Sequence, residues 1–278
     1  MIELPEAETI RRDLDREIVG KKIKDAEVST PKVVTRSGNR TKFVAALEGA
    51  KVTSVDRRSL HLLMGLDNDH TLVCRLGSGG LLRRHANKDP LDPKNVVVLG
   101  FTQGGQLRLI DHAGEAEMFV IENDELEDAV PELMGLGLDP IAEPVSWTRF
   151  AEILLAQKGR LKTLLCDDSV IVGIGDLYSD EILFNAGLRY DRMSDSLSAQ
   201  EIRRFFRAVV ETLHDAVKYR GTTLEDSPFV DVFGEPGSYQ EHLNVYGKAG
   251  ELSPRSRRPI ARTKFSGRWT YYCEQSQV

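Results

Sequence analysis

The sequence predicts an α+β protein in which an N-terminal β-sandwich with flanking helices precedes a helical domain and a terminal β-hairpin. Short apolar stretches separated by Gly-rich turns fill the first half of the chain, which is typical of a sandwich. Beyond residue 146 the apolar residues recur with the period of helices. The run at residues 267–273, rich in aromatic side chains, returns to the pattern of a strand and indicates a final hairpin.

The first expected element is an amphipathic helix. Pro5 suits its first turn, Ile10, Leu14 and Ile18 recur on one face, and Gly20 suits its end. Strands are expected around residues 23–28, 52–63, 72–76, 96–101 and 107–110, with a short helix near residues 43–47.

Four helices are expected in the second half, over residues 147–155, 161–166, 177–186 and 199–219. The last is the best specified, because Ser198 and Glu201 form a capping box and Gly221 stands where a C-terminal cap belongs. The predicted domains are a sandwich over residues 1–133, a Pro-rich linker over 134–145, a helical domain over 146–236 and a hairpin module over 237–278.

Composition narrows the class of protein. The chain has 278 residues, 41% hydrophobic and 29% charged, with a net charge of -6, which disfavours a protein that coats nucleic acid indiscriminately. No apolar stretch is long enough for a membrane span and the acidic start is unlike a signal peptide, so we expect a cytoplasmic monomer. The three cysteines lie too far apart for a disulfide framework or a complete zinc motif.

Charge is nevertheless unevenly distributed. Residues 248–268 contain seven lysines and arginines against the single acid Glu251. Such a run is either a solvated charged face or a surface for a polyanion, and taken alone it does not decide between the two.

Three motifs carry a resemblance to a known family. They are Glu-Leu-Pro-Glu-Ala-Glu-Thr-Ile at residues 3–10, Val-Gly-Ile-Gly-Asp-Leu-Tyr-Ser-Asp-Glu-Ile-Leu-Phe at 172–184, and the ending from Val245-Tyr246-Gly247 to Gln277. In this order and spacing the chain resembles the formamidopyrimidine-DNA glycosylase and endonuclease VIII family from end to end. The resemblance implies a β-sandwich, a helix-two-turns-helix domain, a terminal zinc hairpin and DNA as partner, with an oxidised base flipped into a pocket.

The resemblance also identifies catalytic positions, and one of them is altered. Family enzymes use the amine of a proline at the second position as nucleophile, where this chain has Ile2. Because Ile2 disfavours removal of Met1, the terminal amine of Met1 is expected one residue out of place. Glu3 matches the family carboxylate that protonates the sugar ring oxygen, so Glu3, Glu6 and Met1 are the catalytic candidates. The alternative is that Glu3 and Glu6 only complement a helix N-terminus.

Several other family side chains are replaced. The lesion-site lysine corresponds to Leu60, the methionine that fills the gap left by the flipped base to Ser78, and the partner loop to residues 111–116. The family's four zinc-binding cysteines correspond to Ser253, Ser256, Cys273 and Ser276, so only one thiol remains. The sequence therefore predicts no zinc and no cofactor, and a hairpin held by Phe265, Trp269, Tyr271 and Tyr272.

A phosphate-holding surface is expected on the second half of the chain. Arg268 matches the hairpin arginine that grips a DNA phosphate, and Asp176 replaces the asparagine of the family's helix-two-turns-helix loop. Asp176 could cap the following helix as asparagine does, but its charge disfavours a nearby phosphate. The predicted DNA-binding residues are Arg268, Lys158, Lys162, Gly175, Asp176, Tyr178 and Lys264.

Three hypotheses about function stay open. The chain is a damaged-DNA-binding glycosylase that relies on Glu3 and has an impaired lyase step at abasic sites, or a catalytically silent DNA-binding paralogue, or a fold reused as a protein-interaction module. Retention of Glu3 favours the first, loss of nucleophile, lysine and zinc favours the second, and the acidic net charge with Asp176 favours the third.

Overall fold

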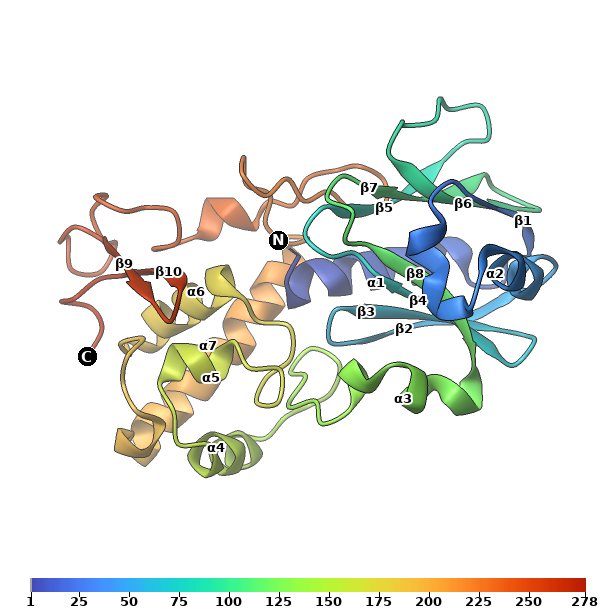
Figure 1. Ribbon diagram of the computed structural model, residues 1–278. Coiled ribbons are helices and arrows are strands. Elements are labelled where there is room, and N and C mark those ends of the chain that lie inside the picture. Colours follow the sequence, from blue (N-terminus) through green and yellow to red (C-terminus); the bar gives the residue numbers. More distant parts are fainter. Residues whose placement is uncertain (1) are drawn as a thin grey trace. The chain divides into compact units, whose positions relative to one another are not determined.

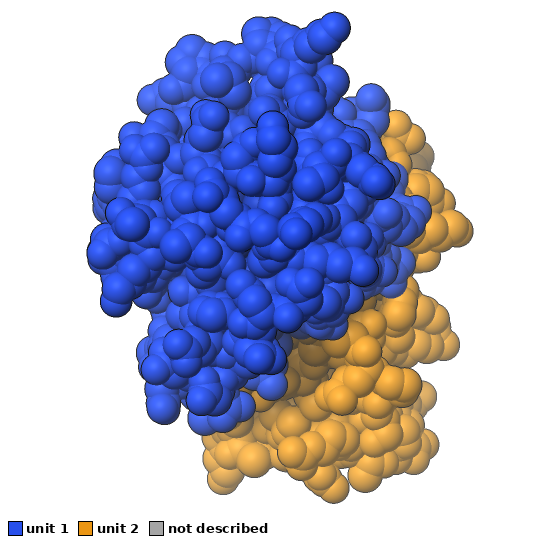
Figure 2. Space-filling view, turned by 90° about the vertical axis from the view of Figure 1, so that its right-hand side faces the viewer, with its two compact units in different colours: residues 1–2, 6–134, 220–237 blue, residues 3–5, 135–219, 238–278 orange. Residues whose placement is uncertain are grey.

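A computed structural model describes residues 2–278 of the chain (Figure 1). The described residues divide into two compact units, coloured separately in Figure 2. Unit 1 comprises residues 2, 6–134 and 220–237, and unit 2 comprises residues 3–5, 135–219 and 238–278. Residues 220–237, which follow the last long helix in sequence, therefore belong to the same packing unit as the sandwich.

Helix α1 (Leu4–Ile18) confirms the predicted amphipathic helix. Ile10, Leu14 and Ile18 are buried in the core of unit 1, and the chain leaves the helix through Gly20 at φ 83°. Burial of this apolar stripe, rather than intrinsic propensity, accounts for most of the stability of such a helix.

Unit 1 is built on two antiparallel four-stranded sheets, with strand orders β1-β6-β7-β5 and β2-β3-β4-β8. Buried side chains of both sheets join one hydrophobic core. This confirms the predicted sandwich. The strands are β1 (Ile23–Val28), β2 (Val52–Arg58), β3 (His61–Leu66), β4 (His70–Arg75), β5 (Gly80–His85), β6 (Asn95–Phe101), β7 (Gln106–Asp111) and β8 (Glu117–Glu122).

The strand predictions were wrong at three places. The stretch at residues 52–63 is two strands, because the chain turns at Ser59 with φ 49° and β2 pairs back onto β3. Strand β5 was missed because its second half is charged, and β8 because acidic residues flank its apolar centre. Both strands are specified by pairing with β7 and β4, which is not a local property of the sequence.

Short helices complete unit 1. Helix α2 confirms the pattern around Phe43 and Leu47, both of which are fully buried. These elements are η1 (Pro31–Ser37), α2 (Arg40–Leu47), η2 (Asn123–Glu125), α3 (Leu126–Ala129) and η3 (Pro131–Leu133).

Unit 2 contains the four predicted helices, α4 (Trp147–Ala156), α5 (Leu161–Leu165), α6 (Asp176–Ala186) and α7 (Ala199–Lys218), with short turns η4 (Ser194–Ser196) and η5 (Tyr239–His242). The capping box at α7 is confirmed: Ser198 accepts from the amide of Glu201, and the Glu201 carboxylate accepts from the amide of Ser198. After α7, Arg220 and Gly221 both have positive φ, 62° and 82°, so the left-handed turn begins one residue before the predicted Gly221.

The terminal hairpin pairs β9 (Ala261–Phe265) with β10 (Arg268–Tyr272). The ring of Tyr190 lies 5.0 Å from Phe265 and 4.9 Å from Tyr272 between ring centroids, which fixes one face of the hairpin. Trp269 is 43% exposed and lies on the other face of the hairpin, where its ring contacts Arg262 and Lys264 of the opposite strand.

Candidate functional site

Glu3 is held at the N-terminus of α6. Its carboxylate accepts hydrogen bonds from the backbone amides of Gly175 (2.6 Å), Leu177 (3.1 Å) and Tyr178 (3.4 Å), and the residue is only 6% exposed. A carboxylate in this position satisfies amides that have no partner within the helix and is stabilised by the helix dipole. The alternative prediction, that Glu3 complements a helix N-terminus, named no helix, and the structure places Glu3 at that of α6.

The same contacts correct two expectations about the loop before α6. The N-cap is Gly175, and Asp176 is the first helical residue with no side-chain capping bond, so Glu3 does the capping expected of Asp176. The Gly175 amide is already bound to Glu3, and the Gly173 amide is bound to Asp168 at 2.8 Å. The Gly175 amide was predicted to donate to a DNA phosphate, and it has no N–H left for that contact because it donates to Glu3.

Glycine at position 175 is required by this arrangement. A Cβ atom there would lie 2.6 Å from Oε1 of Glu3, closer than real Cβ contacts. The amide of Leu4 also donates to the carbonyl of Gly173 at 2.7 Å. The start of the chain is therefore tied to this loop by both backbone and side chain.

Asp176 pairs with Arg268. Nη1 of Arg268 lies 3.0 Å from Oδ1 of Asp176, and both side chains are partly exposed, 46% and 31%. The hydrogen bond to Asp176 raises the pKa of Arg268. The acid that replaces the family's asparagine therefore neutralises part of the charge that Arg268 would offer to a phosphate.

Lys162 is buried, which contradicts its predicted contact with phosphate. It is 1% exposed, and its ammonium donates to Oδ1 of Asp180 at 2.6 Å and to the carbonyl of Trp269 at 3.2 Å. The other oxygen of Asp180 accepts from the amide of Tyr271 at 2.8 Å. Burial raises the pKa of Asp180 to about 7, against the lowering effect of Lys162. This pair joins α5, α6 and the hairpin.

The remaining predicted DNA-binding residues divide by exposure. Tyr178 is 1% exposed and its ring packs 5.7 Å from that of Tyr239, so it offers no side chain to a ligand. Lys158 and Lys264 are exposed. Their roles remain predictions, together with that of Arg268.

Glu6 has a structural environment in unit 1. It is 2% exposed, it accepts from the amide of Thr222 at 2.8 Å, and a Cβ atom at Gly221 would lie 2.8 Å from its Oε1. Glu6 thereby anchors the segment 220–237 to α1. Met1, the third catalytic candidate, lies outside the described residues.

A second anchor of the segment 220–237 was not expected from the sequence. The guanidinium of Arg220 bridges two buried carboxylates, Asp13 on α1 and Asp231 within the segment. Desolvation opposes the charge of Arg220, but hydrogen bonds to both acids leave its pKa raised. These bonds hold in place the loop that lines the pocket described next.

Two pockets of unit 1 share Ile2. One, with a volume of about 460 Å³, is lined by Ile2, Gly80, Arg83, His112, Pro228 and Phe229 among others. The other, about 210 Å³, is lined by Ile2 together with Leu60, Ser78 and Glu115. The positions that the resemblance assigns to nucleophile, lesion lysine and gap-filling methionine are therefore gathered around one pocket, although none retains the family side chain.

The two loops predicted to have lost their DNA-filling residues are bound to each other. Oε2 of Glu115 accepts from the hydroxyl of Ser78 at 2.6 Å and from its amide at 3.1 Å. These bonds hold the pKa of Glu115 below its usual range. Ser78 and Glu115 are thus bound to each other at the surface, and neither side chain is free to enter a DNA duplex.

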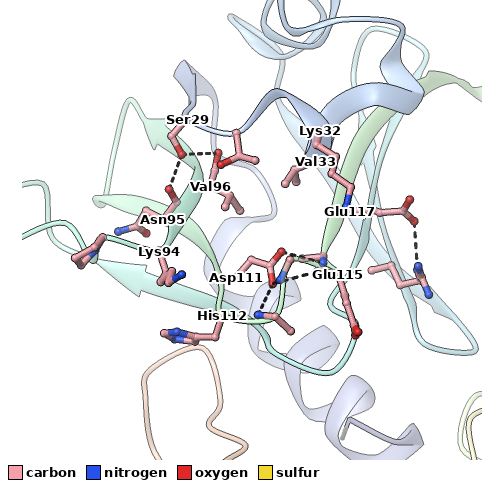
Figure 3. Close-up of a pocket in the computed structure, with 16 residues that line it drawn as sticks. Ser29, Lys32, Val33, Lys94, Asn95, Val96, Asp111, His112, Glu115 and Glu117 are labelled. Carbon is pink, nitrogen blue, oxygen red and sulfur yellow. Dashed lines mark hydrogen bonds and ion pairs between the residues drawn. The ribbon is translucent and has the colours of Figure 1, made fainter.

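Asp111 closes the loop at residues 111–116 on itself, as Figure 3 shows. Its carboxylate accepts from the amides of Ala113 (3.1 Å), Gly114 (2.8 Å) and Ala116 (3.1 Å). The loop borders a pocket of about 800 Å³ that also contains Lys32 and Lys94. An aspartate followed by small residues and glycine is a recognisable signal for such a turn, and the sequence reasoning missed it.

The four positions that correspond to the family's zinc ligands lie together in unit 2. Ser253 Oγ lies 3.3 Å from Ser276 Oγ, and Ser256 Oγ lies 3.1 Å from Cys273 Sγ. Burial would raise the pKa of the Cys273 thiol, but the serine hydroxyls lower it to about 7. One thiol and three hydroxyls do not fit the zinc ion that the family implies. Among residues 2–278, no three His, Cys, Asp or Glu side chains form a metal site.

A sandwich, a helix-two-turns-helix domain and a hairpin with a carboxylate fixed near the chain start define a DNA glycosylase scaffold. The family models agree: the N-terminal domain of formamidopyrimidine-DNA glycosylase matches residues 1–116, and its H2TH domain matches residues 136–227. The chain belongs to the formamidopyrimidine-DNA glycosylase family. In the part of the chain that the structure describes, no helix is long and apolar enough to cross a membrane.

Relatives match over the full length. The formamidopyrimidine-DNA glycosylase of Pelotomaculum thermopropionicum is 35% identical, covering 100% of this chain and 99% of the relative. That of Geobacillus kaustophilus is 37% identical, with 100% of both chains covered. Among solved structures, Lactococcus lactis Fpg in complex with abasic-site DNA has a TM-score of 0.89 at 27% identity, covering 99% of both chains. MutM bound to DNA containing carbocyclic 8-oxo-G has a TM-score of 0.88 at 27% identity, also covering 99% of both.

Proposed function

We propose that this chain is a damaged-DNA-binding protein of base excision repair in which any N-glycosidic hydrolysis relies on Glu3 and the lyase step at abasic sites is impaired. The observation that carries the proposal is the contrast between Glu3, retained and bound by three amides, and the neighbouring position, where Ile2 lines an apolar pocket.

Impairment of the lyase step follows from the chemistry of position two. A Schiff base with the sugar requires an amine, and the backbone nitrogen of Ile2 in a chain that keeps Met1 is an amide with no nucleophilic lone pair. Leu60, on the wall of the same pocket, cannot supply the charge of a lysine. A terminal amine shifted by one residue, roughly 3 Å, loses most of the advantage of proximity.

Hydrolysis without that nucleophile needs only a water molecule and a way to stabilise the sugar as the bond to the base breaks. Three hydrogen bonds from backbone amides fix the direction of the Glu3 carboxylate. A fixed carboxylate stabilises the positive charge that develops on a sugar ring in glycosidic cleavage and can accept a proton from attacking water. Water then adds to the sugar carbon while the base leaves with the bonding electrons.

Binding to the DNA backbone rests on a smaller set of residues than the sequence predicted. Exposed Lys158 and Lys264 remain available, and Arg268 is partly exposed although Asp176 competes for it. The family relationship and the DNA complexes of similar proteins support duplex DNA as the partner. We therefore expect weaker phosphate binding than an asparagine at position 176 would give.

A catalytically silent DNA-binding paralogue is the second candidate. The hydrogen bonds between Ser78 and Glu115 favour it, because they tie together two loops that would have to fill the space left by a flipped base.

The deciding assay uses duplex oligonucleotides that carry oxidised bases or an abasic site. We expect base release that leaves an intact abasic strand until alkali is added, and little covalent trapping by borohydride. Glu3→Gln should reduce base release about a hundredfold or more. Glu6→Gln is the matched control: it removes a buried carboxylate from the same helix, so it should lower the melting temperature without abolishing base release.

Efficient borohydride trapping by the natural chain would refute the impaired lyase step. Tight binding to damaged duplex without base release would assign the silent paralogue instead. Ile2→Pro should increase trapping, because it restores a small second residue that permits removal of Met1 and exposes a proline amine.

A further inference from the structure

The outer face of the terminal hairpin has a composition that the packing of the hairpin does not explain. Strand register places Trp269 opposite Lys264 and Tyr271 opposite Arg262, so these four side chains share one face. The opposite face carries Thr270 and Tyr272, which are 0% and 8% exposed. The buried face holds the hairpin in unit 2. On the outer face Tyr271 packs 5.0 Å from Tyr246 between ring centroids, so the exposed part of that face is Trp269 with Arg262 and Lys264.

Trp269 is the centre of this outer face. Its ring is 43% exposed, with the guanidinium of Arg262 4.2 Å and the ammonium of Lys264 5.2 Å from its centroid. Arg262 and Lys264 are exposed as well, and within residues 2–278 neither forms an ion pair with a carboxylate. The face therefore presents an accessible aromatic ring flanked by two cations that have no acidic partner among the described residues.

We propose that this face, formed by Trp269, Arg262 and Lys264, binds unpaired nucleotides of DNA. A nucleobase stacks on the indole ring while the phosphates on either side are held by the two cations, the combination by which proteins bind single strands without reading sequence. A cation–π contact at an exposed site is weaker than stacking of a base on tryptophan. An arriving base can therefore displace one cation from the ring, and the displaced cation then meets the adjacent phosphate.

The charges of the surrounding residues favour a polyanion over a protein partner. Residues 248–268 carry seven basic side chains against one acid, although the whole chain has a net charge of -6. Arg268 belongs to the edge where the hairpin meets α6 and is engaged by Asp176, so it is not part of the outer face. This inference rests on the proposed function and extends it: it adds a surface for unpaired nucleotides to a protein that is expected to bind damaged duplex.

The test exploits the presence of two tryptophans. Trp147 is exposed to a similar degree, 36%, and also carries an arginine over its ring, Arg203 at 4.3 Å, but it lies at the start of α4. In a Trp147→Phe protein, Trp269 is the single tryptophan, and excitation at the red edge of tryptophan absorption reports on it alone. Titration with oligothymidylate of about ten nucleotides should quench it in a salt-dependent manner.

Trp269→Ala should weaken oligothymidylate binding about tenfold, Trp269→Phe should retain most of it, and Trp147→Ala should leave it within about twofold. Arg268→Ala should weaken binding to abasic duplex more than it weakens binding to oligothymidylate. Because Trp269 is exposed, its variants should keep the natural melting temperature.

Absence of quenching, or equal oligothymidylate affinity of Trp269→Ala and the natural chain, would overturn the inference. If abasic duplex still binds in that case, the proposed function stands while the single-strand surface fails. Tighter binding of oligouridylate than of oligothymidylate would assign the face to RNA and overturn the choice of DNA. Conversely, single-strand quenching without any affinity for damaged duplex would sustain the inference and refute the proposed function.

Discussion

The pocket around Ile2 and the surface at the start of α6 have both lost family side chains, but with different consequences. In the pocket, Ile2 and Leu60 leave apolar walls where reactive groups are expected. At α6 and the hairpin, the changed residues have acquired partners: Asp176 binds Arg268, and Ser256 binds Cys273. Reactivity depends on one atom of one side chain, whereas a scaffold tolerates any substitution that keeps its polar groups satisfied.

Restoring thiolates gives the largest expected effect and tests whether the hairpin has kept the geometry of a zinc site. A variant with Ser253→Cys, Ser256→Cys and Ser276→Cys should bind one zinc ion. The hydrogen-bonded Oγ and Sγ atoms of the four positions lie 3.1 to 3.4 Å apart, and the sulfurs around a tetrahedral zinc ion lie about 3.8 Å apart. Structural zinc contributes on the order of 10 kcal/mol, so a chelator should lower its melting temperature by about 10 °C or more.

The natural chain and the single variant Ser256→Cys are the controls for this experiment. Both should contain no stoichiometric zinc by elemental analysis, and chelators should leave their melting temperatures unchanged. A triple variant that takes up no metal would show that the former ligand positions have drifted apart, and the contrast between the two regions would fail.

The pair Asp176–Arg268 gives the next effect. Asp176→Asn removes a negative charge 3.0 Å from Arg268 and frees that guanidinium for phosphate. Affinity for duplex DNA should rise severalfold, up to about a hundredfold from an estimated 1 to 3 kcal/mol. Arg268→Ala should weaken binding on every sequence and reduce the salt slope by about one. Fluorescence anisotropy at matched salt measures both.

Asp195→Asn serves as the control for charge alone. Asp195 is exposed, and its removal changes the net charge equally without releasing Arg268. Should Asp176→Asn gain no more affinity than Asp195→Asn, this loop does not meet phosphate, and the interaction-module hypothesis becomes the stronger one.

The smallest effect concerns the capping box at the start of α7. A hydrogen bond from Arg192, with the amide of Ser198, lowers the pKa of Glu201 to about 2. A folded-state pKa below the unfolded value stabilises the protein above about pH 4.5 and ceases to do so as the pH falls toward 2. Glu201→Gln should therefore lower the free energy of unfolding by about 1 to 2 kcal/mol at pH 7, and by roughly half as much at pH 3, midway through the loss of the charge contribution.

Urea denaturation at the two pH values measures this difference. Glu211→Gln on the same helix is the control, because the pair Arg207–Glu211 is largely exposed and should contribute less than about 0.5 kcal/mol. A pH-independent effect of Glu201→Gln would mean that its contribution is packing and not the charge at the cap.

The sequence by itself determined the elements whose signals are local. The stripe of Ile10, Leu14 and Ile18 specified α1, and Ser198 with Glu201 specified the start of α7. The serines at former zinc positions were also readable, because ligand spacing is a property of the chain alone.

Only the tertiary structure decided which partners these residues meet. Glu3 accepts a hydrogen bond from the amide of Gly175, 172 residues further along the chain. Lys162 is buried against Asp180, and Ser78 binds Glu115. Each contact joins segments remote in sequence, so its existence depends on how whole elements pack and on satisfying buried polar groups. A local sequence pattern encodes neither the packing of elements nor the partners of buried polar groups. The sequence therefore predicted Lys162 as a phosphate-binding cation and Asp176 as a helix cap, and the structure contradicts both.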